Sequence, residues 1–225
     1  MISLKTQNLP SIILYLLVNL GIFIVLYRTN TVEVDSFRRV FQDLSKKDGI
    51  IFILLPIILF ILSGIIPASW KEVFVFWRIK SSLPGCYAFS RYAKEDDRIN
   101  IELLKSKYGK FPRKASEQNS LWYGIYKNIK NDKGIDKTNK DFLLARELTI
   151  MTIIFILISI PTLLFFTNIW DNNKNNLWFY ILFLLGEYLI IRLIARNHAE
   201  RLVTNVLAYE SSRLHNEKYT NGGQA

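Results

Sequence analysis

The stretch LTIMTIIFILISIPTLLFFT, residues 148–167, decides the fold class because it contains no charged side chain. At about 1.5 Å per residue, a helix of this length crosses the roughly 30 Å hydrocarbon core of a bilayer. Residues 9–27, 49–68 and 177–194 are similarly apolar. The rest of the 225-residue chain is too small to cover four such helices in a soluble core. The sequence therefore predicts an all-α, polytopic membrane protein with four transmembrane helices.

Positive charge predicts the orientation of these helices. Residues 69–147 contain clearly more Lys and Arg than Asp and Glu, and the whole chain has a net charge of +10. Segments rich in Lys and Arg beside a span stay on the cytoplasmic side. We therefore expect the protein in a bacterial inner (plasma) membrane. Both termini are expected on the cytoplasmic side. Four regions follow: a first transmembrane pair (1–68), a basic cytoplasmic helical domain (69–147), a second transmembrane pair (148–194) and a cytoplasmic helical tail (195–225).

The loop between the first two spans contains an amphipathic pattern. Apolar residues recur at helical spacing, and Asp35 or Ser36 could cap the start of a helix. This external helix could lie on the membrane surface or pack over the ends of the spans, and the sequence leaves both alternatives open. The apolar residues are Phe37, Val40, Phe41 and Leu44.

The cytoplasmic domain is expected to contain short helices. Asp97 or Asn100 can cap the start of a first helix, which Gly109 and Pro112 end. A second helix follows Ser116. Apolar residues of the second helix form one stripe, on which Trp122 and Tyr126 are the predicted surface for a partner. That partner could be a protein or a nucleic acid. The stripe consists of Leu121, Trp122, Ile125, Tyr126 and Ile129.

Two boundaries follow from the polar stretches. Residues 131–139 are polar and contain Gly134, which predicts a loop. The next helix would start near Thr138 or Asn139 and run directly into the third span. After the fourth span, a helical stripe continues to about Leu214.

Aromatic and cationic residues alternate in residues 70–80, directly after the second span. This mixture is typical of the lipid headgroup level, where rings lie in the interface and cations reach phosphates. Single-stranded nucleic acid binds similar mixtures, but the neighbouring span favours the membrane. Arginines at the cytoplasmic end of the fourth span are expected to reach phosphates in the same way. The predicted interface residues are Trp70, Lys71, Phe74, Trp77, Arg78, Arg192 and Arg196.

Glu187 lies near the middle of the fourth span, where an ionised side chain is costly and often functional. Asn19 in the first span and Ser159 in the third are expected at a similar depth. If these three face the bundle axis, they form an intramembrane polar layer. The layer could serve as an ion or proton route, or it could join the helices by hydrogen bonds, which is the favoured interpretation.

The sequence predicts no enzyme, no metal site and no cofactor. It contains none of the common nucleotide-binding, serine-hydrolase or zinc-protease motifs, and its two histidines, His198 and His215, lie in the tail. The single Cys86 excludes a cysteine-based metal cluster. The carboxylates at residues 95–97 lie between cations, which favours a self-neutralised, solvated turn.

The layout of spans and a compact cytoplasmic part resembles that of the small multi-spanning effectors of bacterial antiphage (antiviral) defence systems. This resemblance implies a homo-oligomer whose cytoplasmic domain senses a protein or nucleotide signal and perturbs the integrity of the lipid bilayer. The alternative is a non-enzymatic scaffold or sensor subunit that anchors a cytoplasmic partner. A small transporter fits less well, because neither repeat symmetry nor broken-helix signals are present.

Overall fold

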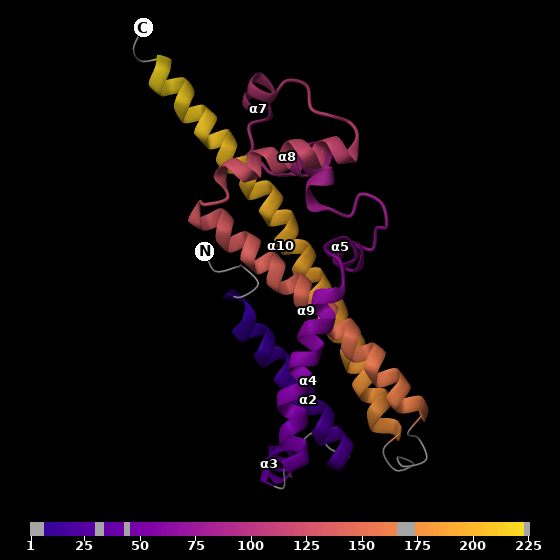
Figure 1. Ribbon diagram of the computed structural model, residues 1–225. Coiled ribbons are helices and arrows are strands. Elements are labelled where there is room, and N and C mark those ends of the chain that lie inside the picture. Colours follow the sequence, from indigo (N-terminus) through magenta and orange to yellow (C-terminus); the bar gives the residue numbers. More distant parts are fainter. Residues whose placement is uncertain (1–6, 30–33, 43–45, 166–173, 223–225) are drawn as a thin grey trace. The chain divides into compact units, whose positions relative to one another are not determined.

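The computed structural model describes residues 7–29, 34–42, 46–165 and 174–222, and all regular structure in these ranges is helical (Figure 1). The prediction of an all-helical chain is confirmed for these residues. The long helices are α2 (Leu9–Thr29), α4 (Lys46–Ile65), α9 (Lys133–Phe165) and α10 (Lys174–Gly222). The shorter elements are α3 (Val34–Gln42), α5 (Ala68–Phe76), η1 (Pro84–Tyr87), η2 (Ala88–Tyr92), α6 (Ala93–Glu95), α7 (Ile101–Tyr108) and α8 (Ala115–Ile129).

Among the described residues, three helices are long and apolar enough to cross a membrane, and they are α2, α9 and α10. Helices α4 and α5 pass the same test only as a pair, which is bent by 94°. The bend lies at Pro67. Proline has no backbone N–H, so it cannot continue the hydrogen bonds of α4. The carbonyl of Pro67 accepts bonds from the amides of Trp70 and Lys71 and so starts α5. The chain thus has three candidate spans, or four if the bent pair counts as one.

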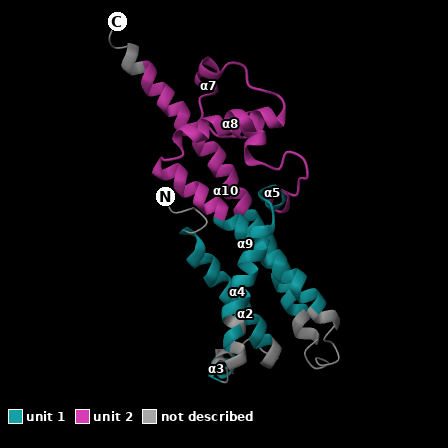
Figure 2. Cartoon of the chain, viewed as in Figure 1, with its two compact units in different colours: residues 1–71, 144–193 teal, residues 72–143, 194–225 magenta. Residues whose placement is uncertain are grey.

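The chain divides into two compact units (Figure 2). Unit 1 comprises residues 1–71 and 144–193, and unit 2 comprises residues 72–143 and 194–225. Unit 1 therefore contains the apolar stretches, and unit 2 combines most of the basic segment with the tail. Helices α9 and α10 contribute residues to both units.

The surface of unit 1 is apolar. Its helices expose large aliphatic and aromatic side chains, whereas several polar side chains of the same helices are buried. Soluble proteins seldom expose contiguous apolar surface on this scale. Together with the length of the helices, this distribution indicates a membrane protein. Exposed examples are Leu14, Ile53, Ile57, Leu182 and Ile190, and buried polar examples are Asn19, Ser63, Thr149 and Thr152.

The amphipathic helix predicted after the first span is present as α3, with Asp35 in its first turn. Val40 of α3 is buried in a cluster with Leu20, Ile24 and Val25 of α2. The helix therefore packs on α2, which was one of the two alternatives. The side chains of Phe37 and Phe41 are not described, and Leu44 lies outside the described residues.

The short helices of unit 2 follow their sequence signals. The side chain of Asn100 caps α7 by accepting the amide of Leu103 at 3.1 Å. Gly109 ends α7 with a φ of 73°, a backbone conformation that favours glycine. Helix α8 begins at Ala115, so Ser116, which was expected to precede the helix, lies in its first turn.

The apolar stripe of α8 is part of the core of unit 2. The prediction that Trp122 lies on a partner surface is therefore wrong. Trp122 is only 6% exposed, and Ile125 and Ile129 are also buried. A Cβ on Gly85 of η1 would lie 2.6 Å from the Trp122 ring, so the absence of a side chain there lets the indole pack against the backbone. Tyr126 is half-buried and stacks on Trp122, with ring centroids 5.6 Å apart.

Two helix ends differ from their predictions. Helix α9 begins at Lys133 instead of near Thr138, because Asp132 caps it by accepting the amides of Gly134 at 2.9 Å and Ile135 at 3.1 Å. The polar residues after Asp132 are therefore helical. Helix α10 continues to Gly222, past the expected end near Leu214.

Glu210 of α10 joins α7 to α10 within unit 2. Its buried carboxylate accepts hydrogen bonds from Tyr108 at 2.6 Å, Lys107 at 2.8 Å and Arg213 at 2.8 Å. Burial raises the pKa of Glu210, but the hydrogen bonds from Arg213, Lys107 and Tyr108 outweigh burial and lower the pKa to about 2. Glu210 is therefore ionised at neutral pH, and its hydrogen bonds hold α7 against α10.

Replacing Trp122 by Ala tests its role in the core. We expect Trp122→Ala to lower the free energy of unfolding of unit 2 by about 3–5 kcal/mol, because a buried indole leaves a cavity beside Gly85. Tyr123→Ala is the matched control, since the neighbouring Tyr123 is 54% exposed and should change stability little. Chemical unfolding of the full chain in detergent micelles measures both effects. Equal stability of the two variants would contradict the core assignment.

Candidate functional site: an intramembrane polar cluster

The structure brings Asn19 and Glu187 together inside unit 1. Asn19 of α2 is 1% exposed, and its Nδ2 donates to Glu187 Oε1 of α10 at 3.3 Å. The same nitrogen donates to the carbonyl of Tyr15 at 3.3 Å. Two of the three residues of the predicted layer are thus in direct contact.

Three hydroxyl groups surround this contact. The hydroxyls of Tyr15 and Thr152 are 2.7 Å apart, and Thr152 donates its own proton to the carbonyl of Leu148 at 2.9 Å. A threonine hydroxyl has one proton, which Thr152 gives to Leu148, so Tyr15 is the group that can donate to Thr152; the Tyr15 hydroxyl also interacts with the Glu187 carboxylate. Tyr180 donates to the carbonyl of Asn19 at 3.3 Å. We call Tyr15, Asn19, Thr152, Tyr180 and Glu187 the polar cluster.

Ser159 differs from its predicted role. Its side chain is buried, but its hydroxyl donates to the carbonyl of Phe155 in the same helix at 2.8 Å. The hydroxyl of α9 that joins the polar cluster belongs to Thr152, seven residues earlier and about 10 Å away along the helix. The sequence gives the depth of a residue only by counting from the end of its apolar stretch. Because helices enter a bundle at different heights, this count cannot distinguish Ser159 from Thr152.

The sequence contained a signal for the tyrosines of the polar cluster. Tyr15 and Asn19 are four residues apart, and Tyr180 and Glu187 are seven apart, so each pair lies on one face of its helix. The side chains that share a face with an intramembrane carboxylate are the natural candidates to contact it. Thr152 had no comparable signal, because several hydroxyl-bearing residues of α9 are equivalent in sequence.

Lys71 is buried, which contradicts its predicted contact with lipid phosphates. Its Nζ lies 2.6 Å from Glu147 Oε2 and 2.9 Å from Oε1, and both side chains are almost inaccessible. Arg146 contacts the same carboxylate at 3.4 Å. The reason is the opposite charge of Glu147 at the start of the third apolar stretch, which pairs with Lys71 at the end of the second. This ion pair links α5 to α9 within unit 1.

The aromatic residues of the predicted interface segment are partly exposed. Trp70 is 57% exposed and Trp77 is 60% exposed, as an interfacial position requires. Phe74 is half-buried. The guanidinium of Arg78 lies over the ring of Tyr87 at 4.5 Å from its centroid, a contact within unit 2.

The two arginines after the fourth apolar stretch do not extend freely. Arg192 is 8% exposed, so its burial contradicts the predicted contact with phosphates. Arg196 donates from Nε to Glu200 at 3.0 Å, one turn further along α10. The carboxylate of Glu200 therefore competes with lipid for Arg196.

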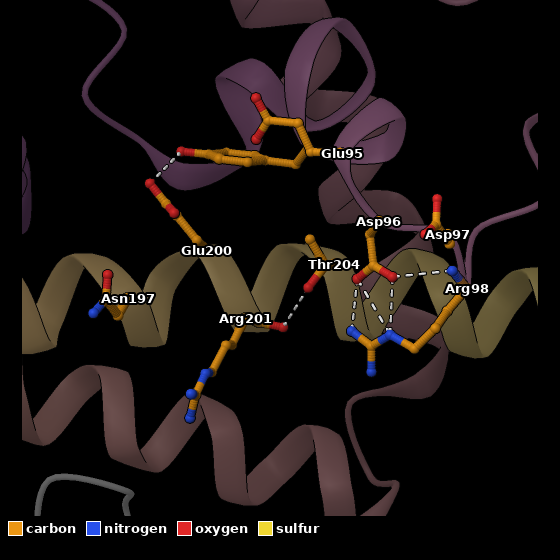
Figure 3. A pocket seen from close by; sticks show the side chains of 9 residues that line it. Glu95, Asp96, Asp97, Arg98, Asn197, Glu200, Arg201 and Thr204 are labelled. Carbon is orange, nitrogen blue, oxygen red and sulfur yellow. Dashed lines mark hydrogen bonds and ion pairs between the residues drawn. The ribbon is translucent and has the colours of Figure 1, made fainter.

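Unit 2 contains a pocket of about 540 Å³ between residues 92–98 and α10 (Figure 3). Its carboxylates are largely neutralised, as the sequence indicated for residues 95–97. Asp96 bonds to Arg98 at 2.6 Å, and this bond lowers the pKa of the Asp96 carboxyl. Glu95 pairs with Arg91 at 3.0 Å. Glu200, on the α10 side of the pocket, pairs with Arg196 at 3.0 Å.

Comparison with known protein families, with curated proteins and with solved structures finds no match to this chain.

The buried ion pair can be tested separately from the polar cluster. We expect Glu147→Gln to lower the free energy of unfolding by about 3–5 kcal/mol, because it leaves the buried Lys71 ammonium unpaired. The double variant Lys71→Met/Glu147→Leu should recover most of this loss. Glu117→Gln is the matched control, since Glu117 pairs with Lys114 on an exposed surface. Unfolding in detergent micelles measures all three, and a Glu147→Gln variant as stable as the control would refute the buried pair.

Proposed function

We propose that the chain crosses a bacterial inner membrane four times, with both termini and unit 2 in the cytoplasm. The four spans lie in α2, α4, α9 and α10, and α5 lies in the interface after its bend away from α4. Three features support this topology: the excess of positive charge in residues 69–147, the exposed Trp70 and Trp77, and the 94° bend.

Labelling of single cysteines tests the topology. In a Cys86→Ala background, we expect Ser116→Cys to react with a membrane-impermeant maleimide only after the cells are lysed. Arg38→Cys should react in intact cells, because the proposed topology places α3 outside. Both positions are exposed, so accessibility of the side chain does not limit either reaction. Labelling of Ser116→Cys in intact cells would overturn the orientation.

We propose that the protein is a membrane effector, of the kind used in antiphage defence, that depolarises the membrane when triggered. The contact of Asn19 with Glu187 carries this proposal. A carboxylate near the middle of a span is costly, and such residues commonly mark paths for ions or protons. Hydrogen bonds between helices would need only neutral side chains, whereas this cluster contains an ionisable group.

The trigger in this proposal acts on unit 2. Helices α9 and α10 each continue from unit 1 into unit 2 without interruption, so a partner or nucleotide signal bound to unit 2 has a covalent route to the spans. Unit 1 is densely packed around Leu16, Leu20 and Leu184. Leak therefore requires rearrangement of the spans or assembly of several copies.

Membrane potential in bacteria tests the effector function. We expect induction of the chain, together with its trigger or its neighbouring genes, to dissipate the potential reported by a voltage-sensitive dye. Glu187→Gln and Asn19→Leu should reduce the rate of depolarisation at least severalfold at equal membrane insertion, because both change the polar cluster. Glu117→Gln is the control with an unchanged rate. Depolarisation that is equal in all four proteins would remove the polar cluster from the mechanism.

The scaffold alternative has less support. Its predicted surface comprised Trp122 and Tyr126, of which Trp122 is buried in unit 2 and Tyr126 is half-buried. A membrane potential that stays constant under every condition would nevertheless favour this alternative. Capture of a partner by the full chain would then have to depend on other residues of unit 2.

A further inference from the structure

Every hydrogen-bond donor in the polar cluster is already used. The two protons on Asn19 Nδ2 go to Glu187 Oε1 and to the carbonyl of Tyr15. The hydroxyl of Tyr15 has one proton for two acceptors, Thr152 and the Glu187 carboxylate. The hydroxyl proton of Thr152 goes to Leu148, and that of Tyr180 goes to the carbonyl of Asn19. No donor of these side chains is left for a further acceptor.

Two acceptor atoms of the polar cluster remain without a hydrogen bond among the described residues. They are Asn19 Oδ1 and Glu187 Oε2, and both are inaccessible to solvent. They belong to the two side chains that already contact each other. A buried acceptor without a partner costs about 1–3 kcal/mol, and more if it is charged. The single proton of Tyr15 cannot serve both Thr152 and Glu187, so the cluster lacks one donor, and the two acceptors without a hydrogen bond belong to Asn19 and Glu187.

Rotating the amide of Asn19 does not remove the deficit. It would place Oδ1 against two further acceptors, Glu187 Oε1 and the carbonyl of Tyr15, and would lose both present bonds. Protonation of Glu187 supplies the missing donor, because it adds one O–H group. Its O–H donates to Asn19 Oδ1 while Asn19 Nδ2 donates to Oε1, which gives two antiparallel hydrogen bonds between an acid and an amide.

Among the described residues, the side chains that interact with the Glu187 carboxyl group, Asn19 and Tyr15, carry no positive charge. The ionisable groups near it are the phenols of Tyr15 on α2 and Tyr180 on α10. Arg192 lies five residues along the same helix, about 140° around its axis from Glu187 at 100° per residue. Glu147 differs in this respect, because Lys71 and Arg146 both contact it. The surroundings of Glu187 therefore favour its neutral form.

We propose that Glu187 holds a proton at neutral pH and pairs with Asn19 as a proton-binding site between α2 and α10. This inference deepens the proposed function, on whose membrane placement it rests, by naming the proton as the ion that the site binds. Loss of the proton places a carboxylate opposite the carbonyl oxygen of Asn19. Deprotonation therefore weakens the contact between the two helices.

Infrared spectroscopy of the full chain in lipid vesicles tests this inference without any measurement of leak. At pH 7 we expect the parent chain to show a carbonyl stretching band of a protonated carboxyl group. Glu187→Gln should lose this band, and Asn19→Leu should move it to higher frequency because a hydrogen bond is lost. Glu117→Gln should keep it unchanged. At alkaline pH the band of the parent chain should be replaced by carboxylate absorption.

The opposite result is also clear. A parent chain with no protonated carboxyl band at pH 7 would overturn the inference. This measurement uses the parent chain alone, so it does not depend on whether a variant folds. A band that persists in Glu187→Gln would overturn it as well, because the proton would then be on another residue. A chain with the band that never depolarises membranes would refute the proposed function alone. A chain that depolarises membranes with an ionised Glu187 would refute the proton site alone.

Discussion

A carboxylate buried in an apolar helix bundle must be neutralised or hydrogen bonded, and this requirement organises unit 1. The structure meets it in two different ways. Glu147 is balanced by an opposite charge, since Lys71 and Arg146 contact it. Glu187 instead contacts the uncharged side chain of Asn19. Removing an ion from water costs several kcal/mol, and an opposite charge and a set of neutral hydrogen bonds are two ways to offset that cost. The contacts of α2 with α10 and of α5 with α9 both follow from this constraint.

The sequence predicted the helices well because their signals are local. Long apolar blocks located the long helices, and Asn100 and Gly109 marked the ends of α7. The start of α9 was missed because the cap is Asp132, inside a stretch whose polarity resembles a loop. Burial was harder, since periodicity shows that α8 has an apolar face but not what covers it. That information lies in Gly85, whose lack of a side chain makes room for Trp122.

The polar cluster was only partly predictable for a similar reason. A charged residue in an apolar stretch is visible without a structure, and Asn19 was the expected partner for Glu187. The hydroxyl groups around them depend on the relative heights of the helices, which the sequence does not specify. The same applies to Lys71, which belongs to an aromatic and cationic segment typical of the membrane interface. Its pairing with Glu147 depends on how two distant segments approach each other, so the local pattern assigned Lys71 to lipid.

The contacts that hold unit 1 together join segments that are far apart in the chain, and this separation fixes the order of assembly. Lys71 precedes Glu147 by 76 residues, and Asn19 precedes Glu187 by 168 residues. At a synthesis rate of about 5–20 residues per second, Lys71 waits roughly 4–15 s and Asn19 roughly 8–35 s for its partner. During that time Lys71 and Asn19 each lack the partner that a later helix supplies. The newly made protein is therefore most vulnerable to quality control before its last helix is inserted.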